Sequence, residues 1–242
     1  MPPTHSAGSY STLKRAVDDA AFMATEHQLH LASQLSTRPK WRLHTHDGTA
    51  EFITKDGLIV TAEVHPIAIM DGTTWTWAWA DDRAASINDA AALQVKRFGE
   101  VKENRMLTRH SYPLTSQYTR VTPEQLMSLS KNIHRIWRHF IFDLPGGARL
   151  YAALHLPQIE LPAPTVATIS QTVRQTVQLF TITKYRRAFL SYAHLRGIAY
   201  QENQSHTQIR LSVNDETAHF SWDTGMLAID DVELDVHTPV RH

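Results

Sequence analysis

The sequence predicts an α+β protein: antiparallel β-meanders with long helices packed on one face, in two similarly organised parts. Three observations support this prediction. Stretches with apolar residues every three or four positions stand apart from stretches in which apolar residues alternate. Turn-forming pairs such as Asp47-Gly48 and Asp71-Gly72 separate the alternating stretches. The order of a long helix followed by a meander occurs once before and once after a proline-rich segment.

Four long segments have the apolar spacing of helices. The third has residues that favour a helix N-terminus, with Thr122 as N-cap and Pro123 at the first helical position. In the fourth, the β-branched run Thr181-Ile182-Thr183 is expected to break or kink the helix, and Gly197 ends it. The predicted helices cover residues 10–35, 84–104, 122–140 and 165–196.

The predicted strands are short and bounded by turn formers. The first four follow one another so closely that they form an antiparallel meander. The next two form a hairpin around Pro145-Gly146-Gly147, and the rest follow Gly197. The predicted strands are 41–46, 49–54, 58–69, 73–80, 140–143, 148–156, 198–202, 206–213, 216–222, 226–229 and 232–236.

A proline-rich segment predicts a domain boundary. Three prolines, Pro157, Pro162 and Pro164, lie within eight residues and cannot continue a helix or a central strand. We therefore expect a first domain over residues 1–157, with the Trp-rich strand, and a second helix-plus-meander unit over 158–242. The second is short for independent stability, so we expect it to pack on the first.

One segment recurs within the chain. Residues 42–57 align without gaps with residues 210–225, and Arg, Leu, Asp, Thr, Ala, Phe and Gly match in place. Both segments are predicted hairpins, whose turns and alternating positions favour such residues. The match therefore indicates either an internal repeat or convergence on hairpin chemistry.

Composition limits the function classes. Lys+Arg and Asp+Glu are both 24, and this balance argues against a nucleic-acid partner. There is no Cys, so disulfides and thiolate chemistry are excluded. The start of the chain lacks the apolar core of a signal peptide, and no run approaches the ~18 apolar residues of a membrane span. We expect a cytoplasmic protein without a membrane partner, in which 15 His would make the chain basic near pH 6.

The most distinctive segment is Thr74-Trp75-Thr76-Trp77-Ala78-Trp79-Ala80, and Gly146-Gly147 with Tyr151 marks the closing hairpin. Over residues 10–156 the chain resembles a bacterial domain-of-unknown-function family with a helix, a meander ending in a Thr-Trp-x-Trp-Ala-Trp-Ala strand, two helices and a closing Gly-Gly-x-x-Tyr hairpin. Here that hairpin spacing is one residue longer, and Asp81 stands where the family usually has Asn. The resemblance implies a fold and no activity, so it assigns no catalytic residue.

Two sets of residues are candidate ligand-binding groups. Trp75, Trp77 and Trp79 alternate along a predicted strand, so their indoles share one face and form either a ligand-stacking wall or a wall of the core. Arg135 and Arg138 share a predicted helix face with Lys131 and His134; this face either holds a phosphate or an acidic partner or is simply solvated. Arg149 adds to its charge.

The third candidate is a metal site. His44 and His46 alternate on one strand face, and His65 on a later strand could approach them. His27 and His30, one helical turn apart, form another possible pair. Because no further ligand has a clear spacing, solvated histidines are the alternative reading.

Enzyme signatures are absent from the sequence: it has no phosphate-binding glycine-rich loop, no nucleophile elbow and no His-Glu-x-x-His. The first hypothesis is therefore a non-catalytic interaction protein, such as a regulator, an adaptor or a toxin-neutralising partner. The alternative is a small-molecule-binding module that uses the Trp wall, and the third is a metal-dependent hydrolase that uses His44, His46 and His65. No cofactor is predicted, another protein is the expected partner, and the oligomeric state is left open.

Overall fold

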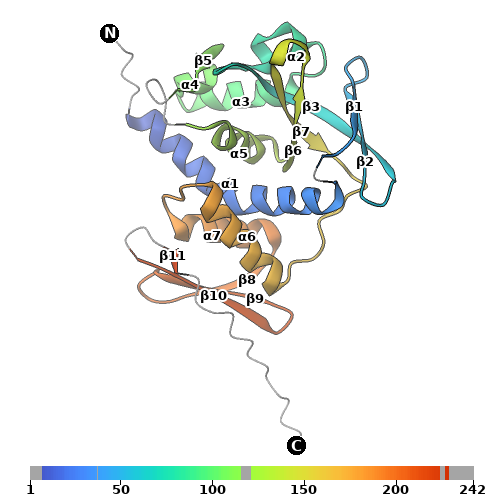
Figure 1. Cartoon of the computed structure of the whole chain (residues 1–242). Helices are drawn as coiled ribbons and strands as arrows, with labels where there is room; N and C mark the ends of the chain where they lie inside the picture. The colour runs from blue at the N-terminus through green and yellow to red at the C-terminus, as the bar shows by residue number, and fades with distance from the viewer. Residues whose placement is uncertain (1–6, 37, 116–120, 224–226, 229–242) are drawn as a thin grey trace, which may run out of the picture. The chain divides into compact units, whose positions relative to one another are not determined.

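The computed structural model describes residues 7–36, 38–115, 121–223 and 227–228 (Figure 1). It divides into two compact units. Unit 1 contains Met1–Val17 and His27–Leu161, and unit 2 contains Asp18–Glu26 and Pro162–His242. The first helix, α1 (Ala7–Gln34), therefore contributes to both units, which the sequence did not predict. The packing of one predicted domain on the other stays a prediction.

Unit 1 is built on a seven-stranded antiparallel sheet. Five strands follow the order β1-β2-β3-β4-β5, while β7 pairs with β3 and β6 pairs with β7. The long β3 pairs along one edge with β2 and then β4, and along the other edge with β7. The strands are β1 (Trp41–His44), β2 (Thr49–Ile53), β3 (Ile59–Asp71), β4 (Thr74–Trp77), β5 (Ser111–Pro113), β6 (Arg138–Asp143) and β7 (Arg149–His155).

The two faces of this sheet differ in character. Residues directly opposite one another in antiparallel strands point to the same face. One face, here called the core face, carries Val64, Leu154 and Phe142 and packs with Leu31 of α1 and with Leu35 just beyond its end. The other face carries His65, Ala153 and His139 in one row, and further along it Trp75 and Tyr151.

Short helical elements complete unit 1. Helix α5 begins with a capping box, in which Thr122 and Gln125 satisfy each other's backbone N–H groups, as the Thr-Pro start predicted. Among the described helices, none combines the length and the apolar character of a membrane span. The elements are η1 (Ala78–Ala80), α2 (Asp82–Ala85), α3 (Ala90–Val101), α4 (Arg105–Thr108), α5 (Pro123–His134) and η2 (Pro145–Gly147).

Unit 2 consists of two helices and a four-stranded antiparallel sheet of order β11-β10-β9-β8, together with residues 18–26 of α1. Its core includes Phe22, Phe189 and Phe220, all at most 1% exposed; the Phe189 ring centroid lies 4.8 Å from that of Phe22 and 4.9 Å from that of Phe220. The elements are α6 (Val166–Leu179), α7 (Tyr185–Arg196), β8 (Ala199–Glu202), β9 (Gln208–Val213), β10 (Glu216–Trp222) and β11 (Leu227–Ala228).

The recurring segment forms equivalent hairpins in the two units. In unit 1, Leu43 pairs with Ala50, and in unit 2 Leu211 pairs with Ala218, which are the aligned positions. Every pair of the β1–β2 hairpin has its counterpart in β9–β10. The pairing with the strand that follows each hairpin differs by one residue. Ile53 pairs with Ile59, whereas the aligned Ser221 pairs with Ala228 and not with Leu227, the residue aligned with Ile59. The aligned Gly225 lies outside the described residues.

The structure confirms the α+β class and corrects several elements. The helix expected over 122–140 ends at His134, because Arg135 adopts a left-handed conformation (φ 61°). The strand expected over 73–80 ends at Trp77 and continues as η1. The helix expected over 165–196 is broken between Leu179 and Tyr185, around the β-branched run that predicted a break. The strand expected over 232–236 lies outside the described residues.

Candidate functional site

The predicted Trp wall lies inside unit 1. Trp75 and Trp77 have no exposed surface, and their ring centroids are 5.6 Å apart in an edge-to-face arrangement. The Trp75 ring also lies 5.0 Å from that of Tyr151, and Trp77 Nε1 donates a hydrogen bond to the carbonyl of Met106 (3.1 Å). The two indoles are therefore part of a packed core, and neither is open to a ligand.

Trp79 differs from the other two indoles. It lies in η1, beyond the end of β4, and is only partly buried. The ring is flanked by His110, with centroids 5.2 Å apart, and by Lys96, whose Nζ lies 4.5 Å from its centroid. A single wall of three alternating indoles, as the sequence predicted, is thus absent, because the backbone leaves the strand conformation at Ala78.

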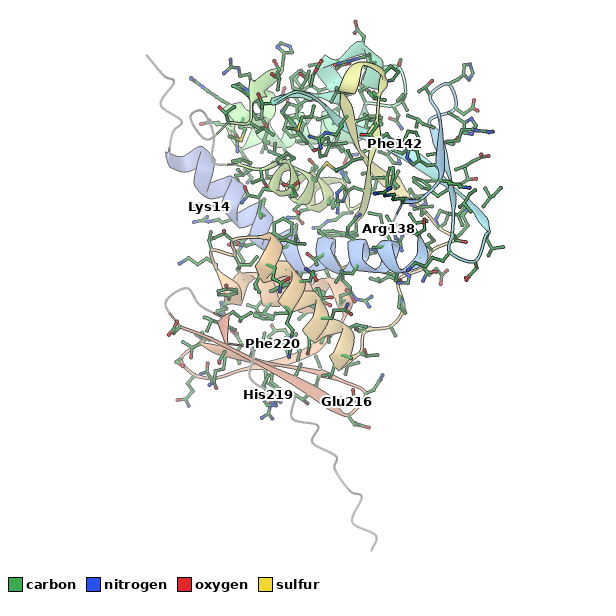
Figure 2. The ribbon with its side chains drawn as sticks, viewed as in Figure 1. Lys14, Arg138, Phe142, Glu216, His219 and Phe220 are labelled. Atoms are coloured by element: carbon green, nitrogen blue, oxygen red, sulfur yellow. The ribbon has the colours of Figure 1, made fainter. Side chains whose placement is uncertain are left out.

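Arg135 and Arg138 do not form a common patch. Arg135 is exposed, and its guanidinium donates to Asn132 Oδ1 (3.1 Å). Arg138, labelled in Figure 2, lies on β6. It is on the core face, where it is 9% exposed and donates to the carbonyls of Leu156 and Ile159. The expected helix face is wrong at these positions because α5 has already ended, and Arg138 instead binds the chain that follows β7.

The three candidate metal-binding histidines lie apart, each beside its own acidic residue. His44 is 3.6 Å from Glu51, the His46 ring is almost fully exposed 2.9 Å from Asp47, and His65 is 3.7 Å from Glu63. Across the described part of the chain, no group of three or more His, Asp or Glu residues could hold a metal ion.

The second histidine pair is not arranged as a metal site either. His27 stacks on Trp137, and burial lowers the pKa of His30. The two residues thus have separate surroundings, although they lie one turn apart on α1.

An exposed apolar surface lies where β2 turns into β3. Ile53 and Ile59 are directly paired and are 38% and 66% exposed, and Leu58 in the turn is 65% exposed. Trp41 on β1 is also 37% exposed, but it lies on the opposite face of the sheet, where its ring packs on Phe140 and Phe142. We call Ile53, Leu58 and Ile59 the apolar tip. The sequence-based predictions did not include it, although a Leu-Ile pair directly after the turn Lys55-Asp56-Gly57 was a visible signal.

Buried basic groups were also missed. Lys131, on α5, is 2% exposed, whereas the sequence had placed it on a helix face that either binds a phosphate or an acidic partner or is solvated. Burial lowers its pKa to about 7. Burial, together with His65 and Lys131, lowers the pKa of His134 to about 3, and burial also lowers that of His139. Only the fold could reveal this group, because His139 reaches it from β6 after the chain has reversed.

The chain matches a known protein family. A family model described as a family of unknown function (DUF6882) matches residues 14–157. No curated protein and no solved structure matches the chain.

Proposed function

The chain belongs to the DUF6882 family, a family of unknown function, and from this premise we propose that it is a non-catalytic interaction protein that binds a partner protein through the apolar tip. The observation that carries the proposal is the exposure of Leu58 and Ile59, 65% and 66%, beside the paired Ile53. Contiguous exposed apolar side chains of this kind mark interaction sites, whereas isolated ones are ordinary.

The size of the tip suggests the kind of complex. Burying a large apolar side chain that was exposed stabilises a complex by about 1.5–3 kcal/mol at most. Three partly exposed residues cannot supply the large apolar area of an obligate dimer, which buries about 2,000 Å² or more. We therefore propose a partner with a complementary apolar surface that binds reversibly, as expected for a regulator, an adaptor or a toxin-neutralising protein.

The edge strand beside the tip favours a partner that contacts side chains over a partner that adds a strand to the sheet. The edge strand β1 has four residues and follows Pro39 and Lys40. Short edge strands flanked by proline and lysine are a common means of preventing another strand from pairing. The partner would therefore rest on the side chains of the tip.

The test is a native mass spectrum of the chain purified gently from its own host. The test variant carries Leu58→Ser and Ile59→Thr, which remove apolar surface but keep a strand former at position 59. The control is Val101→Ser, which removes an isolated apolar side chain that is 77% exposed. We expect the wild type and the control to carry a second protein and the test variant to lose it.

Three outcomes would contradict the proposal. They are a wild-type chain that carries no other protein, a complex that survives in the test variant, and a complex between two copies of this chain.

The other two hypotheses lack a favouring observation. A small-molecule-binding module would have to use Trp79 alone, since Trp75 and Trp77 have no exposed surface. A hydrolase built on His44, His46 and His65 would need these side chains to converge, whereas each stands beside a separate carboxylate.

A further inference from the structure

The strongest unexplained feature of unit 1 is a group of basic side chains between α5 and the sheet. Helix α5 lies along the sheet face that carries His65 and His139: Glu124 near its start interacts with Tyr151, and His134 at its end interacts with His65. Lys131 interacts with both His134 and His139. We call Lys131, His134 and His139 the basic cluster.

The nitrogens of the two histidines are shielded from water. Part of each residue is exposed, but His134 Nε2 and His139 Nδ1 are buried, and neither has a hydrogen-bond partner among the described residues. Their shielding matters because the positive charge of a protonated ring is shared between its two nitrogens, which then both carry a proton. A charge placed there would lose its hydration without gaining a partner.

The surrounding charges do not compensate for such a proton. Among the described groups that act on the cluster or on His65, the one carboxylate is that of Glu63, which lies beside His65 and is 66% exposed at its side chain. Other titratable groups on the packed elements include Glu124 on α5, Arg138 and Asp143 on β6, His155, Tyr151 and Arg149 on β7, Lys14, Arg15, His27 and His30 on α1, and Lys96, Arg97 and Glu100 on α3.

A hydrogen bond fixes the protonation state of His134. Its Nδ1 accepts the backbone N–H of Ile136 (3.1 Å), which requires a free lone pair on Nδ1. This bond spans the left-handed turn at Arg135 that separates α5 from β6. Full protonation of the ring would break it, so charging His134 would weaken the same turn that holds the end of α5.

The start of β6 is held independently. The Gln28 side chain donates to the carbonyl of His139 (3.1 Å) and accepts from its backbone N–H (3.2 Å). Because β6 also pairs with β7 along its whole length, α5 is the more easily displaced side of the cluster.

We propose that the basic cluster is an acid-sensitive latch, which keeps α5 on the sheet while Lys131, His134 and His139 are neutral and releases it when they gain protons. Each new charge repels the others across the same buried space, so the release of α5 becomes more favourable with each proton gained.

The direction of the pH effect follows from linkage. A base whose pKa is lower in the folded state than in the unfolded state binds fewer protons when folded, so stability falls as pH falls. For His134, with a folded pKa of about 3, the loss begins near its unfolded pKa of about 6.5. For Lys131, with a folded pKa of about 7, the loss occurs between about pH 10.4 and 7. The two residues therefore act in separate pH windows.

The test measures hydrogen exchange of the α5 amides in the full chain, corrected for the intrinsic pH dependence of exchange. Between pH 7.5 and 5.5, each histidine that stays neutral while α5 is docked, but gains a proton when α5 is released, should lower the docking equilibrium constant of α5 about tenfold. Between pH 9.5 and 8, Lys131 should lower it about 25-fold. The α6 amides of unit 2 serve as the internal reference.

Variants separate the two windows. His134→Gln should reduce the change below pH 7 about tenfold while the contribution of His139 remains, and Lys131→Met should flatten the dependence above pH 7.5. His46→Gln, which replaces an almost fully exposed ring, should change neither. If α5 and α6 lose protection in parallel, or if the wild type and His134→Gln have the same profile below pH 7, the latch is refuted. If His134→Gln cannot be purified in a folded form, Lys131→Met provides the test. A Lys131→Met profile identical to that of the wild type above pH 7.5 then refutes the latch.

Discussion

Arg196 Nε lies 2.9 Å from Glu26 Oε2, and the two side chains are only 11% and 7% exposed. The contact is an ion pair without the alignment of a straight hydrogen bond. It joins the segment of α1 that belongs to unit 2 to the last turn of α7. Burial raises the pKa of Glu26, and Arg196 partly offsets this effect.

The first prediction concerns this pair. Glu26→Gln or Arg196→Met alone should destabilise unit 2 by about 3–5 kcal/mol, because each leaves a buried charge without its partner. The double variant should lose much less than the sum of the two. Urea unfolding, monitored by the intrinsic fluorescence of the chain, measures the free energy of unfolding of the two single variants and the double variant. Additive losses would contradict a coupled pair.

The second prediction compares two buried indoles. Trp77→Phe removes the hydrogen bond to the Met106 carbonyl, whereas Trp75→Phe removes a buried N–H that has no partner among the described residues. Both lose the same side-chain volume, so each variant is the other's control. Trp77→Phe should be the less stable by about 1 kcal/mol or more in thermal unfolding. Equal losses, or a larger loss for Trp75→Phe, would show that the hydrogen bond contributes nothing.

The third prediction concerns the close approach of α3 and α4. A Cβ added at Gly99 would lie 2.6 Å from Leu107 Cβ and 3.2 Å from the Leu107 backbone carbon, and a backbone atom cannot simply rotate away. Gly99→Ala should therefore destabilise unit 1 by about 1–3 kcal/mol, although alanine is the better helix former by about 1 kcal/mol. Glu100→Ala, at the exposed neighbouring position, should change the midpoint of thermal unfolding little. A Gly99→Ala variant with a raised midpoint would contradict the observed packing.

The two aligned hairpins show where local sequence suffices. Leu43, Ala50 and Phe52 point toward the core of unit 1, and their counterparts Leu211, Ala218 and Phe220 are buried in unit 2. A hairpin's register depends on its turn and on alternation along its own strands, and both are encoded within about 15 residues. A duplication explains the match, as does convergence on the same local rules, so the internal repeat stays a hypothesis.

The candidate sites were predicted less well than the fold. The sequence showed that Trp75 and Trp77 share a face, but it could not show that Tyr151 and the segment around Met106 cover that face. In the same way, helical spacing placed Lys131 and His134 together, and only the position of α5 over the sheet decided that they are buried.

The sequence by itself determined the α+β class, the helix start at Thr122, the break near residues 181–183 and the first turn of both hairpins. These features depend on caps, turn residues and periodicity, which act over a few neighbouring residues. The tertiary structure alone decided that α1 is divided between two units, that Arg135 reverses the chain, and that the basic cluster is enclosed. Burial depends on which distant segments pack together, and no local pattern specifies that choice.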